Sequence, residues 1–154
     1  REGATRFYLS GLMANDVATL FAGTLVTAKA IGGGAGAASA LKMCYAAYTK
    51  GSSALVLAIR ALAEDNGVTE ALLTEWDVSQ KGMRESSERS AVRTSPKAWR
   101  FAGEMREIAA TFDAAGLPDG FHLAAAEIYE RMAHFKNEDS VGLEQVIEAL
   151  LPKQ

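Results

Sequence analysis

Lys42 is the residue whose type and setting point most directly to chemistry. It stands near the start of a stretch that reads as one long helix, among small and apolar neighbours. At 100° per residue, Thr49 and Ser53 fall close to the azimuth of Lys42, which gives a narrow polar line on this helix. A lysine is costly to bury without a partner, so Lys42 either reaches solvent or faces a wet cleft. In a cleft it could act as a general acid or base; the alternative is an ordinary solvated lysine.

A cluster of glycines between residues 32 and 36 precedes the same helix and could suggest a phosphate cradle. The dinucleotide spacing G-x-G-x-x-G is not present, however, because Ser39 stands where the third glycine would be, and there is no Walker lysine pattern. A flexible connector is therefore the favoured interpretation.

The other candidates for chemistry are weaker. His122 and His134 share no metal-ligand spacing with Cys44, so no zinc site is expected. His122 lies beside a glycine-rich helix start and could bind an anion, although a surface or packing histidine is the favoured interpretation. Lys50 lies at the edge of the polar line and is favoured as a solvated lysine. Cys44 is expected to be an inert buried thiol.

Composition bounds the class of protein. The chain has 154 residues, of which 49% are hydrophobic and 23% charged, as in a soluble globular domain. Its net charge of −3 argues against nucleic-acid binding. Its longest apolar run, about six residues, is far below the roughly 18 to 20 that a membrane span needs. The single cysteine excludes an internal disulfide framework and fits a reducing compartment, so a cytoplasmic protein is expected.

The first thirty residues have the pattern of an α/β sheet. Phe7–Leu9 is strand-like, Asn15 or Asp16 can cap a short helix over residues 17–21, and residues 25–31 form a second strand. Three elements are too few to make a sheet with a core of its own. The segment therefore reads as the end of a domain, or as an addition to a neighbouring one.

The remainder reads as helices only, so the expected fold class is mainly α. The strongest is a long helix over residues 38–65, ended by Asn66-Gly67. Its most regular stripe has steps of four and three, and other faces are also apolar, as in a central buried helix. About 28 residues span roughly 42 Å, which exceeds the radius of so small a domain, so we expect a partner subunit to cover the excess. The stripe consists of Leu41, Tyr45, Tyr48, Ser52, Leu55, Ile59 and Leu62.

Shorter helices follow over residues 70–78, 80–93, 95–115, 121–135 and 141–150. Thr69 and Ser95 are expected to cap the helices that follow them. Arg84 can pair with Glu88 four residues on. Trp76 and Trp99 are expected to be core anchors.

Several segments together resemble a known family. The residues G-A-A-S-A-L-K-M (36–43) and Y-A-A-Y-T-K-G (45–51) resemble the start of the C-terminal domain of the β-hydroxyacid dehydrogenase and 6-phosphogluconate dehydrogenase superfamily. The resemblance is narrowest to its branch of NAD(P)-binding phosphogluconate dehydrogenase-like proteins, and it spans about residues 37–135. Supporting pieces are L-L-T-E-W (72–76), P-K-A-W-R (96–100), G-E-M (103–105) and G-L-P-D-G-F-H (116–122).

The resemblance implies an architecture. Members have an N-terminal Rossmann domain followed by an all-helical domain that mediates dimerisation. Residues 1–35 would then be the tail end of a Rossmann-like domain and a hinge, and residues 36–154 the helical substrate and dimerisation domain. It further implies a homodimer, a small-molecule substrate, and NAD or NADP in the full-length protein. The cofactor fingerprint would lie upstream of this chain.

The resemblance also assigns roles to residues. Lys42-Met43 matches the position of the superfamily's catalytic lysine, which exchanges the proton of the substrate hydroxyl while hydride moves to or from the nicotinamide. Ser39, Thr49, Lys50 and His122 become substrate-binding candidates. Ala46 stands where the superfamily commonly has asparagine, so an imine or another carbonyl-type substrate stays open beside a hydroxy acid.

Two functional hypotheses remain at this point. In the first, the chain is the C-terminal substrate-binding and dimerisation part of an NAD(P)-dependent oxidoreductase, inactive as these 154 residues alone. In the second, it is a non-catalytic helical homodimerisation module derived from such an enzyme.

Overall fold

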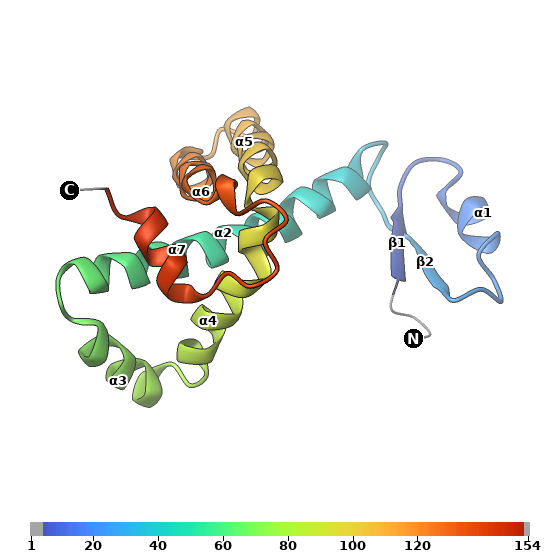
Figure 1. Cartoon of the computed structure of the whole chain (residues 1–154). Helices are drawn as coiled ribbons and strands as arrows, with labels where there is room; N and C mark the ends of the chain where they lie inside the picture. Colours follow the sequence, from blue (N-terminus) through green and yellow to red (C-terminus); the bar gives the residue numbers. More distant parts are fainter. Residues whose placement is uncertain (1–4, 153–154) are drawn as a thin grey trace. The chain divides into compact units, whose positions relative to one another are not determined.

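The computed structural model describes residues 5–152, and the structural statements below refer to them. The chain divides into two compact units, Arg1–Tyr45 and Ala46–Gln154, so the first turns of the long helix group with the strands. The described residues are mainly helical, with two short strands near the start, which confirms the predicted fold class (Figure 1).

The first unit begins with a strand–helix–strand arrangement. Strands β1 (Thr5–Leu9) and β2 (Val26–Ala30) pair in parallel and lie side by side in Figure 1, with helix α1 (Ala14–Thr19) in the connection between them. A parallel pair needs such a crossover. The predicted strands are confirmed. The helix starts earlier than predicted and neither Asn15 nor Asp16 caps it, because both already lie inside its first turn.

Helix α2 (Ala37–Asp65) is the long helix that the periodicity predicted. Its 29 residues span about 43 Å. It ends as the Asn-Gly pair predicts, because Gly67 takes a left-handed φ of 64°. The N–H groups of Gly67 and Val68 then donate to the carbonyls of Glu64 and Ala63, at 3.0 and 2.9 Å.

The burial of α2 differs from the sequence prediction. In the second unit its regular stripe faces solvent, with Tyr48 76%, Leu55 46% and Leu62 63% exposed. The expectation of a helix buried on all sides is therefore wrong for the single chain. The side that packs inward is made mainly of small residues, which let neighbouring helices approach closely. Its buried residues are Ala46, Ala47, Gly51, Ser53, Ala54, Leu57, Arg60, Ala61 and Ala63.

The remaining elements belong to the second unit. They are α3 (Thr69–Ser79), α4 (Met83–Thr94), the 3₁₀ turn η1 (Ser95–Lys97), α5 (Ala98–Ala114), α6 (Gly120–Arg131), the 3₁₀ turn η2 (Ala133–Phe135) and α7 (Leu143–Leu150). Two predicted helices are therefore each divided into an α-helix and a 3₁₀ turn. The predicted caps are also wrong: Thr69 is the first residue of α3 and its hydroxyl donates to Glu64, and the hydroxyl of Ser95 donates to the carbonyl of Ala91.

The core of the second unit centres on α5 and α6, which lie side by side (Figure 1). Its largest fully buried side chains are Tyr129, Leu57, Met105, Ile108 and Met132. Trp76 is buried, as predicted for a core anchor. Trp99 is 47% exposed, contrary to that prediction, because the side chain of Lys136 covers its ring from outside, with Nζ 4.2 Å from the ring centroid.

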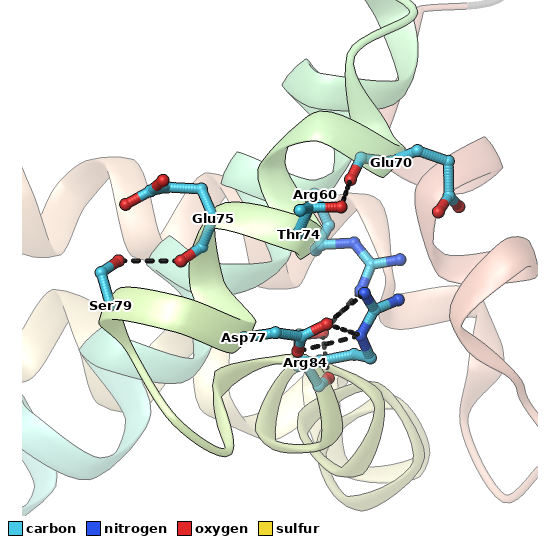
Figure 2. A network of polar contacts seen from close by, with 8 residues as sticks. Arg60, Glu70, Thr74, Glu75, Asp77, Ser79 and Arg84 are labelled. Carbon is cyan, nitrogen blue, oxygen red and sulfur yellow. Dashed lines mark hydrogen bonds and ion pairs between the residues drawn. The ribbon is translucent and has the colours of Figure 1, made fainter.

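A polar network joins α3 to α4 (Figure 2). Arg84 pairs with Asp77 on the neighbouring helix rather than with Glu88, through Nη2 to Oδ2 at 2.6 Å and Nε to Oδ1 at 3.2 Å. This hydrogen bonding lowers the pKa of Asp77. Arg60 of α2 is buried beside this network, and its Nη1 donates to the hydroxyl of Ser87 at 2.7 Å. Burial lowers the pKa of the Arg60 guanidinium.

Candidate functional site

A cleft of about 690 Å³ lies within the first unit, between β1 and the first turns of α2. It contains Lys42 and Ser39, two of the residues that the sequence singled out. It is lined by Arg6, Phe7, Tyr8, Leu9, Ala38, Ser39, Leu41, Lys42 and Tyr45.

The start of α2 is held at this cleft by backbone geometry. The glycine turn after β2 includes Gly33 and Gly36 with φ of 89° and 95°, a region that favours glycine. A Cβ at Gly33 would lie 2.9 Å from the Cβ of Ala37, so a side chain there would also clash. The hydroxyl of Ser10, at the end of β1, accepts a hydrogen bond from the N–H of Ala38 at 3.0 Å. The turn therefore acts as the predicted connector.

Lys42 is exposed and lines the cleft, so its ammonium group can reach both water and a bound molecule. Residues three apart lie on one face of a helix, which places Ser39, Lys42 and Tyr45 along the wall of the cleft. Arg6, on β1, adds a second cationic side chain to the lining. Such a set can attract a negatively charged small molecule and exchange a proton with it.

Lys50 lies in the second unit and is engaged with core residues. Its ammonium group forms an ion pair with Glu104 of α5 and lies 4.7 Å from the centroid of the Phe101 ring. The hydroxyl of Tyr129, on α6, donates to the carbonyl of Lys50 at 2.8 Å. These contacts tie α2 to α5 and α6, which gives Lys50 a structural role; its role in substrate binding stays a prediction.

His122 lies at the start of α6 and is only 5% exposed. Its ring packs against Phe112 and Phe121, with centroids 4.3 and 5.3 Å away. Its Nδ1 is buried and has no hydrogen-bond partner among the described residues, and burial lowers its pKa. A Cβ at Gly51 would lie 4.0 Å from Nε2, so the ring is held against α2. This surrounding agrees with the packing interpretation of His122.

Thr49 and Ser53 continue the predicted polar line in the second unit. The hydroxyl of Ser53 donates to the carbonyl of Thr49 at 3.0 Å and accepts a hydrogen bond from Nη2 of Arg93 at 3.2 Å. Ser53 is buried and Thr49 half-buried. Of the five predicted site residues, Ser39 and Lys42 share the cleft of the first unit, whereas Thr49, Lys50 and His122 belong to the second unit.

The sequence did not single out every residue of the cleft. Arg6 and Tyr8 line it from β1, but a two-strand pattern does not say which strand faces the following helix. Cys44 is exposed rather than buried, because its side of the helix is left uncovered. No group of three or more His, Cys, Asp or Glu residues that could hold a metal is found within residues 5–152. No helix in this range is long and apolar enough to span a membrane.

The family relationship agrees with this architecture. Residues 63–132, from the end of α2 to the residue after α6, match the family described as "Domain of unknown function (DUF1932)". The chain carries a DUF1932 domain. This family is a C-terminal domain of 6-phosphogluconate dehydrogenase-like NAD(P)-binding proteins, which confirms the resemblance found in the sequence. No curated protein matches the chain.

The DUF1932 relationship raises the question of where NAD(P) would bind. A strand, a glycine turn and a helix start could in principle hold a pyrophosphate on their N–H groups. Here the N–H groups of Ala37, Ala38 and Ala40 already donate to the carbonyl of Gly34, the hydroxyl of Ser10 and the carbonyl of Gly36. The turn before α2 therefore does not fit a dinucleotide pyrophosphate.

Proposed function

We propose that this chain is the substrate-side and dimerisation part of an NAD(P)-dependent oxidoreductase. The observation that carries the proposal is the shared cleft of Lys42 and Ser39 at the start of α2, on a chain that continues into a DUF1932 domain. A dehydrogenase-like C-terminal domain is what the family match supports. The hydride chemistry, the substrate and the dimer are the article's own proposals.

Each residue of the cleft has a proposed task. Nζ of Lys42 gives or takes the proton of the reacting hydroxyl, carbonyl or imine group. Arg6 attracts a negatively charged substituent, and the hydroxyl of Ser39 hydrogen-bonds the substrate. The dinucleotide, which supplies or accepts the hydride, is held outside the turn before α2, because the N–H groups there are already bonded.

The proposed setting is a homodimer in the cytoplasm. The exposed apolar stripe of α2 supports association with a partner. The single cysteine supports a reducing compartment. The proposed substrate is a small molecule, either a hydroxy acid and its keto form or an imine.

The test uses the native polypeptide that contains this chain. Oxidation of NADPH and NADH is followed with small keto acids, ketones and cyclic imines. Lys42→Met is expected to lower kcat by about 100-fold or more, since general acid–base groups contribute about 10²- to 10⁴-fold. Lys81→Met removes an exposed lysine from the turn after α3 and is expected to leave kcat unchanged. Equal turnover in the Lys42→Met and Lys81→Met variants would reject Lys42 as the proton donor.

The second candidate function is a non-catalytic homodimerisation module. The observation that favours it is the exposed apolar face of α2, which needs a partner but needs no cofactor. It predicts a native polypeptide that self-associates and binds neither NADPH nor NADH.

A further inference from the structure

We infer that one face of α2 is the surface on which a second copy of this chain packs, helix against helix. The inference rests on the proposed dimer and specifies the face that forms it. We call this face the α2 seam. It consists of Tyr48, Ser52, Leu55, Ile59 and Leu62, all in the second unit.

The α2 seam is exposed although it is the most regular apolar stripe of the helix. Tyr48, Leu55 and Leu62 are 76%, 46% and 63% exposed, and Ser52 and Ile59 are half-buried. The residues that α2 buries in its own unit lie mainly on the opposite side, among them Ala54 and Leu57. The unit therefore packs with one side of α2 and leaves the other uncovered.

The spacing of the seam matches a partner that is itself a helix. Its steps are four, three, four and three, a mean of 3.5 residues per turn. This is the repeat that keeps an apolar line facing a second helix along a left-handed supercoil, with the seam residues at the two core positions of each heptad. From Tyr48 to Leu62 the line extends over about 21 Å.

The flanks of the seam favour a second copy over a different protein. Helix pairs that select a foreign partner commonly do so with charges beside the seam. Here these positions hold Thr49, Val56 and Ala63 on one side, and Gly51 and Ala58 on the other, none of which is charged. Small flanking residues also allow two helices to approach closely.

The apolar surface extends beyond the helix itself. Phe121, at the start of α6, is 49% exposed and lies against the flank position Gly51, where a Cβ would be 3.1 Å from its Cε1. The three large exposed seam residues present on the order of 300 Å², a size at which apolar patches commonly mark interaction sites. A stable interface buries about 800 Å² per partner, so the seam would form the apolar centre of a larger contact.

The test is the oligomeric state of the full chain, measured by sedimentation equilibrium over a range of concentrations. Wild type is expected to have the mass of two copies. Leu55→Glu and Leu62→Glu are expected to raise the dissociation constant at least about 100-fold, because each places an unpaired charge in the contact. The matched control is Val78→Glu, which adds the same charge to a 74% exposed valine on α3 and should leave the dimer intact.

A second variant guards against an effect on folding. Ser52→Arg adds a long charged side chain to the seam without removing any apolar packing, and it too should give a monomer with the helical circular-dichroism spectrum of the wild type. Wild type with the mass of one copy would overturn the inference. Seam variants that stay as dimeric as Val78→Glu would overturn it as well.

The outcome is distinguishable from that of the proposed enzyme function. Dimers that survive seam substitution, with turnover that still depends on Lys42, would reject the seam and leave the oxidoreductase in place. Turnover that does not depend on Lys42, with seam variants that dissociate, would reject the catalytic role and leave the seam.

Discussion

Tyr129 shows how one hydroxyl group can tie three helices of the second unit together. The side chain is fully buried on α6, its ring packs edge-on against Phe101 of α5, and its hydroxyl donates to the carbonyl of Lys50 on α2. Burial also raises its pKa, so the hydroxyl keeps its proton for donation at neutral pH.

Removing only this hydroxyl is expected to destabilise the fold. Tyr129→Phe keeps the ring but leaves the carbonyl of Lys50 without this donor, which should cost about 1 kcal/mol in the free energy of unfolding. Urea denaturation measures the change. Tyr48→Phe removes the same atom from an exposed ring and should change the free energy by less than about 0.5 kcal/mol. Equal effects in both variants would contradict the structural role of Tyr129.

His122 predicts a pH dependence of stability. Its pKa in the folded state is lowered from 6.5 because its ring is buried among Phe112 and Phe121. The unfolded chain therefore takes up the proton first as the pH falls through about 6.5, which favours unfolding. The urea midpoint should be lower at pH 5.5 than at pH 7.5.

The variants for this test are supplied by the two histidines of the chain. His122→Leu removes the titrating group from an apolar site and should reduce the difference between the two midpoints. His134→Asn changes an exposed histidine and should keep the wild-type difference. If His122→Leu retains the full difference, other groups carry the pH dependence.

At the scale of elements, the ends of the helices were easier to predict than their packing. Asn66-Gly67 marks the end of α2 because a left-handed residue is needed there, and only local geometry is involved. The side that α2 buries was not predictable in the same way. Its faces are nearly all apolar, and the choice of the Ala54 side over the Leu55 side depends on which neighbouring helices fit against small residues.

A pair of glycine substitutions tests this account of the helix end. Gly67→Ala should lower the free energy of unfolding by about 1 kcal/mol, because alanine disfavours the φ of 64° at this position. Gly103→Ala should raise it by a similar amount, since Gly103 lies inside α5 with open space around its Cα and alanine is the better helix former. Thermal or urea unfolding measures both, and changes of the same sign would contradict the account.

At the scale of the whole molecule, the sequence located part of the candidate site. Lys42 and Ser39 were named from helix periodicity and family resemblance, and both line the cleft of the first unit. Arg6 could not be named, because its place in the cleft depends on how β1 packs against the start of α2. The spacing that placed Thr49 near the azimuth of Lys42 describes a single helix and says nothing of the other elements that cover it.

The central claim is that the protein is an NAD(P)-dependent oxidoreductase in which this chain forms the substrate side. The most direct measurement is a titration of the native polypeptide, and of the 154-residue chain alone, with NADPH and NADH, followed by nucleotide fluorescence. The account predicts saturable binding of at least one nucleotide to the native polypeptide. It predicts none below about 100 µM, a value within the usual substrate range, for the chain alone, because the N–H groups before α2 are already bonded. A native polypeptide that binds neither nucleotide would contradict the claim.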